Sequence, residues 1–193
     1  MSASIAFAPL DAGHFNAWAA FIERNHNECY CRYWHFSGDK NAWFARMSFS
    51  PGENRREAES EIATPSMTGM IAMRGTEVVG WVKLVRLDVN EKLKRLPQHR
   101  SLPPQNEATW MIACLLVDEQ ERHHGLATQL VGEALGLARS IGVQVIRALP
   151  RDLQGAEVSD EQLLLGTTAM FLRNGFTRTG GDDAYPILEF VVR

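Results

Sequence analysis

An apolar strand that runs through a glycine-containing turn into an amphipathic helix constrains the fold of this chain more than any other feature. From Thr109 to Val117 the residues are almost all apolar, which is typical of a strand buried on both faces. Beyond the turn, apolar residues recur at spacings of three and four, at Leu126, Leu130, Ala134, Leu137 and Ile141. This periodicity predicts a helix that ends near Gly142.

The turn between strand and helix predicts a seat for an anion. The first backbone N–H groups of a helix have no partner within the helix, and the helix dipole adds partial positive charge beside them. Phosphate groups are favoured at such a place. Gly125 lets a ligand approach the backbone closely, and Ala127 keeps the next side chain small. We therefore expect this turn to carry function.

The pattern Arg122-x-x-Gly125-x-Ala127 resembles the acyl-CoA signature of the GNAT N-acetyltransferase superfamily. The segments that follow extend the resemblance. A strand from Val143 to Leu149 comes directly after the helix, and the segment Gly166 to Phe176 is similar to the family's next helix, which ends in a Gly-Phe step. The resemblance covers roughly residues 68 to 192. It implies an α/β (α+β) fold with a mixed, mostly antiparallel sheet and helices on both faces.

The resemblance also implies acetyl-CoA as cosubstrate, with its pyrophosphate on the turn and its pantetheine along the preceding strand. An amine of the acceptor would attack the thioester directly in a ternary complex, and a strand amide near Leu115 or Leu116 would stabilise the oxyanion. The cofactor-binding residues implied are Leu115, Leu116, Val117, Arg122, His123, His124, Gly125, Leu126, Ala127, Thr128 and Phe171.

The catalytic groups do not carry over from the resemblance. Many family members have a tyrosine four residues before the Gly-Phe step, and it acts as the acid that protonates the departing thiolate. This chain has Phe171 at that position. Some have a glutamate base on the strand before the turn, and the strand Thr109 to Val117 contains no carboxylate. Positioning alone supplies much of the rate for an activated thioester. The remaining candidates for proton transfer are Glu107, Cys114 and Tyr185.

An aromatic and cysteine-rich segment, Cys29 to Trp34, is the second distinctive feature. Its Cys-x-Cys spacing does not match structural zinc sites, and it lacks the two-residue spacer of thioredoxin-like pairs, so we expect no metal. The segment resembles one in an uncharacterised bacterial branch of GNAT proteins, in the region that builds the acceptor pocket. The candidate acceptor-binding residues are Cys29, Tyr33, Trp34 and Trp81, although core packing explains aromatic residues equally well.

Other elements follow from local patterns. Asp11 is placed to cap a first helix that carries Phe15, Trp18 and Ile22 on one face, and the mixed charges of residues 53–61 indicate a solvated helix face. Two hairpins are expected. One joins 67–73 to 77–87 through Gly75, and the other joins 176–179 to 185–192 through a turn at 180–183.

The chain of 193 residues has the length of one domain, and its formal charge of −3 disfavours nucleic acid as a partner. No apolar run is long enough to span a membrane, so we expect a cytoplasmic protein. We expect a single GNAT-like domain over residues 1–193, with a helical acceptor-side region at 1–66 and the sheet with the acyl-CoA core at 67–193. A homodimer is a further expectation, since dimers are frequent in the family.

Three functions are consistent with these patterns. The first is an acetyl-CoA-dependent N-acetyltransferase that acts on a small-molecule or peptide amine. The second is a catalytically weak acyl-CoA sensor, which the missing tyrosine and glutamate keep open. The third is a thiol-based metal or redox protein built around Cys29 and Cys31. Release of CoA in the presence of amines distinguishes the first two, and a metal assay or thiol count tests the third.

Overall fold

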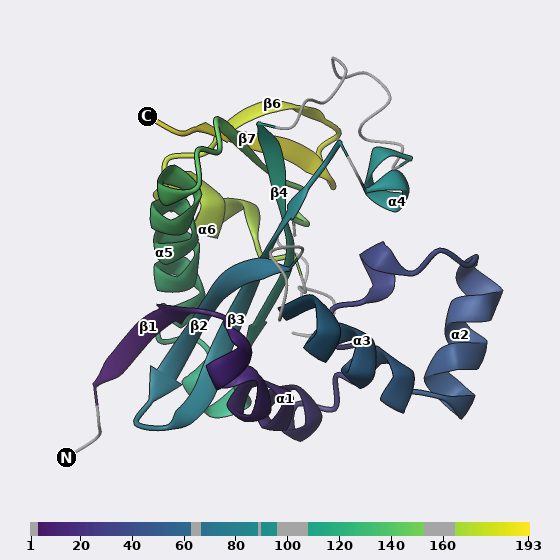
Figure 1. Ribbon diagram of the computed structural model, residues 1–193. Helices are drawn as coiled ribbons and strands as arrows, with labels where there is room; N and C mark the ends of the chain where they lie inside the picture. Colours follow the sequence, from purple (N-terminus) through teal and green to yellow (C-terminus); the bar gives the residue numbers. More distant parts are fainter. Residues whose placement is uncertain (1–3, 63–66, 89, 96–107, 153–164) are drawn as a thin grey trace.

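A seven-stranded sheet in the order β1-β2-β3-β4-β5-β7-β6 forms the centre of the molecule. The computed structural model describes residues 4–62, 67–88, 90–95, 108–152 and 165–193 (Figure 1). The neighbouring strands are antiparallel except for the parallel pair β4–β5. The strands are β1 Ile5–Pro9, β2 Thr68–Arg74, β3 Glu77–Arg86, β4 Thr109–Val117, β5 Val145–Ala148, β6 Thr177–Gly181 and β7 Pro186–Val191.

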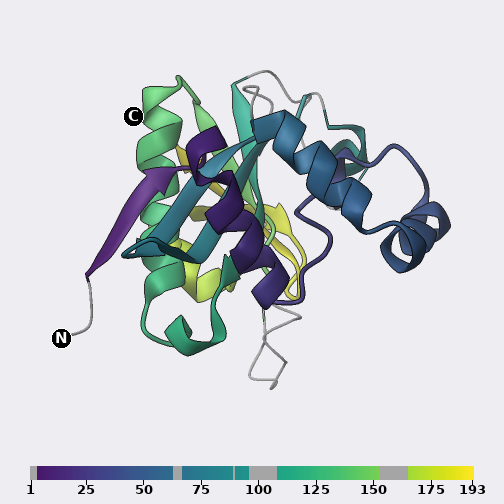
Figure 2. The ribbon, with the colours of Figure 1, turned by 60° about the horizontal axis from the view of Figure 1, so that its bottom comes forward.

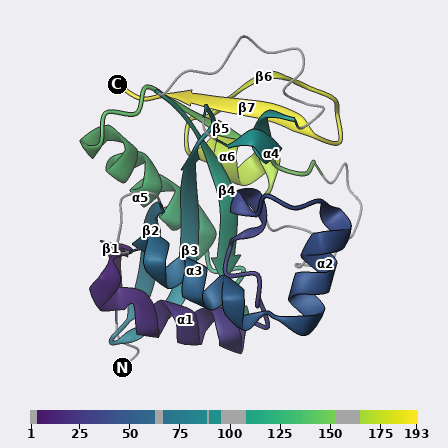
Figure 3. The same ribbon diagram turned by 45° about the vertical axis from the view of Figure 1, so that its right-hand side comes forward.

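Helices cover both faces of this sheet, which confirms the fold class expected from the sequence. Figures 1 and 2 show α1 to α3, in purple to blue, on the side of the sheet away from green α5. Figure 3 shows α2 at the edge of the molecule, away from the sheet. In the described residues, no helix is both long and apolar enough to cross a membrane. The helices are α1 Phe15–Arg24, α2 Lys40–Phe49, α3 Gly52–Ile62, α4 Glu91–Lys94, α5 Leu126–Ser140 and α6 Thr168–Arg173.

Hydrophobic cores on both faces hold α1 and α5 to the sheet. On one face, the apolar stripe of α5 predicted from the sequence packs on β2, β3 and β4, with Leu130 and Ala134 fully buried. On the other face, Trp18 of α1 lies edge-on to Trp81 of β3, with ring centroids 5.6 Å apart. Burial of these side chains supplies the main driving force for folding.

Strand β4 separates from β5 after a short parallel contact. Only the residues from Thr109 to Met111 pair with β5, at Val145 to Arg147. In the described part of the chain, the rest of β4 has no strand partner on that side. A register shift against β3 leaves Ala113 as the extra residue of a bulge. The open edge between β4 and β5 matches the gap that the family resemblance implies for pantetheine.

The structure departs from the local predictions in several places. The strand β1 was not predicted, because a five-residue edge strand with no clean alternation of burial carries little sequence signal. The side chain of Asp11 accepts the N–H of His14 and caps a 3₁₀ turn that precedes α1, rather than α1 itself. Strand β5 is shorter than expected, because only 145–148 pair with neighbouring strands.

The last hairpin also differs from its prediction. The expected turn began at residue 180, but Gly180 and Gly181 continue β6 and pair with Ile187 and Pro186 of β7. The turn lies at 182–185, where the Asp182 carboxylate accepts two backbone N–H groups, those of Ala184 and Tyr185, at 3.0 and 2.7 Å.

Candidate functional site

The N-terminus of α5 has the geometry of an anion seat. Gly125 caps the helix with a φ of 83°, in the left-handed region that favours glycine, and as a glycine it has no side chain to accept from the first N–H groups. A Cβ added to Gly125 would meet no atom within 4 Å, so the space in front of these amides is open. The turn therefore fits a phosphate group on the evidence of its own backbone.

A cavity of about 330 Å³ lies in front of this turn. Arg122 and Arg173 bring positive charge to it, and the Nε of Arg122 donates to the carbonyl of Val117 at 3.1 Å, which ties the turn to the end of β4. The carboxylate of Glu121 is held by Arg74 at 2.8 Å. The lining consists of Leu115, Leu116, Val117, Glu121, Arg122, His123, Gly125, Leu126, Ala127, Thr128, Gly166, Thr167, Met170 and Arg173.

Two of the residues predicted to bind the cofactor lie outside this lining. Phe171 is fully buried, because its position on α6 directs it into the core, and its ring centroid lies 5.1 Å from that of Phe176. The adjacent Met170 lines the cavity instead. His124 is exposed on the turn, outside the lining. The sequence analysis did not predict Thr167, which lines the cavity. A threonine directly before a helix is a common N-cap, and the Thr167 side chain does accept the N–H of Met170 in α6.

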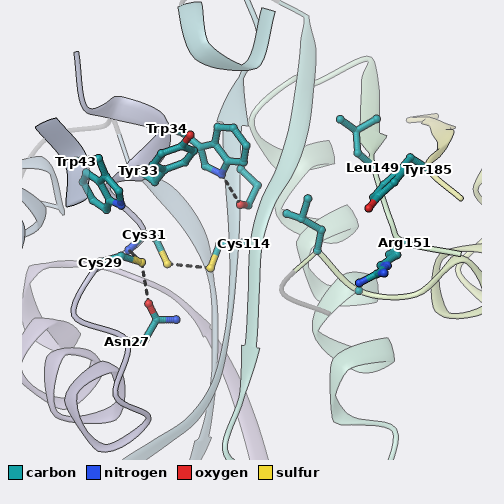
Figure 4. Close-up of a pocket in the computed structure, with 13 residues that line it drawn as sticks. Asn27, Cys29, Cys31, Tyr33, Trp34, Trp43, Cys114, Leu149, Arg151 and Tyr185 are labelled. Atoms are coloured by element: carbon teal, nitrogen blue, oxygen red, sulfur yellow. Dashed lines mark hydrogen bonds between the residues drawn. The ribbon is translucent and has the colours of Figure 1, made fainter. Parts of the chain in front are cut away.

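A second cavity, of about 510 Å³, lies further back along β4 (Figure 4). The aromatic and cysteine-rich segment lines one side of it. Figure 4 shows Leu149, Arg151 and Tyr185 on the opposite side. The lining consists of Asn27, Cys29, Cys31, Tyr33, Trp34, Trp43, Ala113, Cys114, Leu149, Arg151, Leu165, Gly166 and Tyr185.

Trp34 anchors the aromatic side of this cavity to the sheet. Its Nε1 donates to the carbonyl of Ala113, the bulge residue of β4, at 2.8 Å. Tyr33 packs edge-on against both Trp34 and Trp43, with ring centroids 5.0 and 5.5 Å away. The indole of Trp34 is thus fixed by a hydrogen bond to the bulge, and Tyr33 and Trp43 pack outward from it.

The thiols of the three cysteines lie on the floor of the cavity. The Sγ of Cys31 donates to the Sγ of Cys114 at 2.9 Å, and that of Cys29 donates to Asn27 Oδ1 at 2.7 Å. The hydrogen bond to Cys114, together with burial, raises the pKa of Cys31. The hydrogen bond with Cys31 and burial likewise raise the pKa of Cys29. Both groups are therefore held as thiols, whereas metal ligands and nucleophiles are thiolates.

A buried lysine supports the strained turn that carries these thiols. Tyr30 and Cys31 have φ values of 46° and 55°, which are uncommon for residues with side chains. Lys83 of β3 is fully buried and donates from Nζ to the carbonyl of Cys31 at 2.9 Å, and burial lowers the pKa of Lys83. Strain of this kind persists only where the surrounding structure holds it in place.

An ion-pair network fixes the same segment from the other side. Arg32 is buried and pairs with Glu57 of α3 at 2.9 Å and with Glu61. Glu57 also accepts from Arg46 of α2 at 2.5 Å. Residues 53–61 were expected to form a solvated helix face, but Glu57 and Glu61 pair with the buried guanidinium of Arg32. These ion pairs connect α2 and α3 to the aromatic and cysteine-rich segment.

The remaining predicted site residues occupy different places. Trp81 does not line the second cavity, because its side chain is fully buried against α1, with Nε1 donating to Cys31 Sγ at 3.3 Å. Cys114 and Tyr185 lie in the lining, and Glu107 lies outside the described residues. Among the described residues, no group of three or more His, Cys, Asp or Glu is arranged to hold a metal ion.

The two cavities meet at one point of β4. Ala113 and Cys114 line the second, aromatic cavity, and the next residue, Leu115, begins the lining of the first cavity, in front of α5. Gly166 belongs to both linings. The two linings are therefore adjacent at Cys114 and Leu115 and share Gly166.

Comparison with known proteins agrees with this geometry. The model of the acetyltransferase (GNAT) family matches residues 34–156, more than half of the chain, and the chain belongs to this family. As a member it is an acyltransferase whose cosubstrate is acetyl-CoA. None of the curated proteins matches the chain significantly in sequence.

Solved structures share the fold at low sequence identity. The PaiA N-acetyltransferase of Thermoplasma acidophilum in complex with coenzyme A has a TM-score of 0.56 at 13% identity, over 97% of this chain and 99% of that one. The ribosomal-protein-S18-alanine N-acetyltransferase of Escherichia coli has 0.50 at 11%, over 98% and 94%. The CoA-dependent acyl-homoserine lactone synthase BjaI, with SAM and isopentyl-CoA, has 0.57 at 13%, over 98% and 84%. These likenesses establish the fold alone.

Proposed function

We propose that this protein moves an acetyl group from acetyl-CoA to a primary amine of a small molecule or peptide, by direct attack in a ternary complex. The observation that carries the proposal is the meeting of two cavities on β4, between Cys114 and Leu115. The cavity in front of α5, called here the phosphate-side cavity, has the features of a phosphate seat. The cavity lined by Tyr33, Trp34 and Trp43 is called here the acceptor cavity. Two substrates placed in them would bring their reacting ends together.

The residues of the phosphate-side cavity would hold the cosubstrate. The backbone amides from Gly125 to Thr128 face the open space in front of α5 and suit its phosphates, with Arg122 and Arg173 adding positive charge. The open edge of β4 beyond Met111 offers backbone groups to the pantetheine amides, as another strand would.

The transfer step needs three contributions from the chain. The acceptor nitrogen attacks the thioester carbonyl carbon, the carbon–sulfur bond breaks, and the departing sulfur takes up a proton. A backbone amide near Leu115 or Leu116 would stabilise the developing oxyanion. Cys114 lies where the two cavities meet, and its thiol is the first candidate acid for the departing sulfur. Tyr185 lines the same cavity and is the second candidate acid.

No carboxylate is found among the described residues that line the acceptor cavity. We propose that the attacking amine loses its proton to water, so that the chain accelerates the reaction through positioning and electrostatics. The rate should then rise with pH as the fraction of unprotonated amine increases, up to the ordinary pKa of the acceptor.

Thermal unfolding with and without acetyl-CoA tests the cosubstrate seat. A ligand at about 100 times its dissociation constant stabilises by roughly 2.7 kcal/mol, which raises Tm by about 5–10 °C for a chain of this size. Gly125→Glu places a negative side chain in the open space before α5 and should abolish the shift. Gly136→Glu is the matched control, because it adds the same charge on the exposed side of the same helix. Equal shifts in both variants would contradict the proposed seat.

Release of free CoA in the presence of amines separates a transferase from a weak sensor. Turnover that depends on the amine supports the proposal, and binding of acetyl-CoA with no turnover on any amine would favour the sensor. Cys114→Ala should lower kcat and leave acetyl-CoA binding unchanged, whereas a purely packing role would alter stability and not kcat. The division into an acceptor-side region at 1–66 and an acyl-CoA core at 67–193, the cytoplasmic location and the homodimer stay predictions.

A further inference from the structure

Two thiols from distant parts of the chain meet on the floor of the acceptor cavity (Figure 4). The Sγ atoms of Cys31 and Cys114 lie 2.9 Å apart, although the two residues are 83 positions apart in sequence. Both are free cysteines, and both belong to the lining of the cavity. A disulfide bond is about 2.05 Å long, so the sulfurs need to approach by only about 0.9 Å to bond. A small solute that enters the cavity therefore meets two sulfurs already close to bonding distance.

Strand β3 fixes the position of Cys31 opposite Cys114. Lys83 is the register partner of Cys114 in the β3–β4 pair, and partner side chains lie side by side on one face of a sheet. The Nζ of Lys83 donates to the carbonyl of Cys31 at 2.9 Å. Trp81, two residues earlier and on the same face of β3, donates from Nε1 to the Sγ of Cys31 at 3.3 Å. The contact between the two sulfurs is therefore held in place by the sheet.

The third thiol of the cluster, that of Cys29, has further partners of its own. Its Sγ donates to Asn27 Oδ1 at 2.7 Å and accepts the backbone N–H of Cys31 at 3.3 Å. Hydrogen bonding within the cluster and burial raise the pKa of Cys29 and that of Cys31, and protonated thiols react slowly. We therefore expect the cluster to stay reduced until it is exposed to an oxidant for a sustained period.

We propose that hydrogen peroxide converts Cys31 and Cys114 into a reversible disulfide, which switches off acetyl transfer and leaves the binding of acetyl-CoA intact. The thiolate of one cysteine attacks an oxygen of the peroxide, the O–O bond breaks, and a sulfenic acid and one water form. The sulfur of the other cysteine attacks the sulfenic sulfur, the S–S bond forms, and a second water leaves. The two thiols thus lose two electrons and two protons, and the peroxide takes up both.

The disulfide would act on the acceptor side of the site. It consumes the thiol of Cys114, the first candidate acid for the departing sulfur, and it ties the aromatic and cysteine-rich segment covalently to β4. The lining of the phosphate-side cavity begins at the next residue, Leu115, and the glycine that caps α5 is not part of the cluster. The loss of turnover rests on the proposed transferase function, whereas formation of the disulfide does not depend on it.

Counts of free thiols, taken in the unfolded protein, test the disulfide directly. The wild type has three cysteines, and after peroxide the count should fall from three to one and return to three with dithiothreitol. Cys29→Ser is the matched control, because it removes one sulfur of the cluster and keeps the proposed pair, so its count should fall from two to none. Cys31→Ser and Cys114→Ser should each keep two. Chymotrypsin cleaves after Tyr30 and separates Cys29 from Cys31, so mass spectrometry identifies which peptides are joined.

Rates of CoA release show what the disulfide does to turnover. Phenethylamine, spermidine and a lysine-containing peptide are compared on the reduced wild type, and the fastest acceptor is kept. The kcat of oxidised wild type and of oxidised Cys29→Ser should be about tenfold or more below that of the same protein after dithiothreitol. Oxidation should change the kcat of Cys31→Ser by less than about twofold. Stabilisation by acetyl-CoA in thermal unfolding should be the same before and after oxidation.

The outcomes separate the two proposals. A thiol count that stays at three in the oxidised wild type, or a disulfide that includes Cys29, would overturn the assignment of the pair. An unchanged kcat in protein that carries the disulfide would overturn the switch. If acetyl-CoA does not stabilise the reduced wild type, or no amine releases CoA from it, the proposed function fails, and the thiol count still decides whether the disulfide forms.

Discussion

His35 should make the protein lose stability in mild acid, and substitution should remove that loss. His35 is the last residue of the 3₁₀ turn 33–35, and its Nε2 is buried with no hydrogen-bond partner among the described residues. Burial, followed by repulsion from Lys83 and Arg32, lowers the pKa of His35 to about 3. The folded state therefore keeps the imidazole neutral at pH values where the unfolded chain protonates it.

The size and sign of the effect follow from proton linkage. Between pH 6.5 and about 3 the unfolded state binds one more proton than the folded state at this residue, so the free energy of unfolding falls as the pH falls. Each pH unit in this window amounts to about 1.4 kcal/mol. At pH 5 the loss relative to neutral pH is about 2 kcal/mol, or roughly 4–8 °C in Tm for a chain of this size.

Urea unfolding of the wild type and of His35→Gln at pH 7.5, 6.0 and 5.0 measures the loss. Glutamine stays neutral throughout, so the difference in unfolding free energy between the two proteins should shift in favour of the variant by about 2 kcal/mol across this range. Contributions from other titrating groups cancel in the difference. His124→Gln replaces an exposed histidine and should follow the wild type. If the difference in unfolding free energy between wild type and His35→Gln stays constant from pH 7.5 to 5.0, the reasoning is refuted.

Three further results are expected. Trp34→Phe removes the hydrogen bond to Ala113 and should therefore destabilise the protein by about 1 kcal/mol in thermal unfolding. In steady-state kinetics it should raise KM for the acceptor and leave acetyl-CoA binding unchanged. Lys83→Met releases the strained carbonyl of Cys31 and should lower kcat/KM about tenfold; unchanged kinetics would contradict a positioning role. Because the pKa values of Cys29 and Cys31 are raised, both thiols should react with iodoacetamide at pH 8 much more slowly in the folded than in the unfolded protein, and equal rates by mass spectrometry would contradict this.

The structure also shows what holds the aromatic and cysteine-rich segment in place. Two thiols close in sequence suggest metal or redox chemistry, but the close partner of Cys31 is Cys114, which comes from β4, 83 positions along the chain. Cys31 also donates its backbone N–H to Cys29 Sγ at 3.3 Å, and it is held by Trp81 and Lys83 of β3. The segment thus serves as a wall that is fastened to the sheet, and its thiols are kept protonated by the contacts that fasten it.

The sequence by itself determined the features that depend on neighbouring residues. The apolar run of β4, the period of α5 and the glycine before it are local, and each element obeys its own geometry wherever it packs. These features pointed to the turn at Gly125, whose left-handed conformation and open surroundings the structure describes, and the fold class followed from the family resemblance that they carry.

Only the tertiary structure decided which distant side chains meet in the cavities. Trp81 and Phe171 were predicted to be site residues, yet both are fully buried in the cores, because the side of a strand or helix that faces a cavity depends on how the elements pack. Arg151, Trp43 and Gly166 had no local pattern that marked them, and the fold brings them to the linings. Local periodicity specifies which residues share a face, whereas the identity of the facing surface is set by packing between elements far apart in the chain.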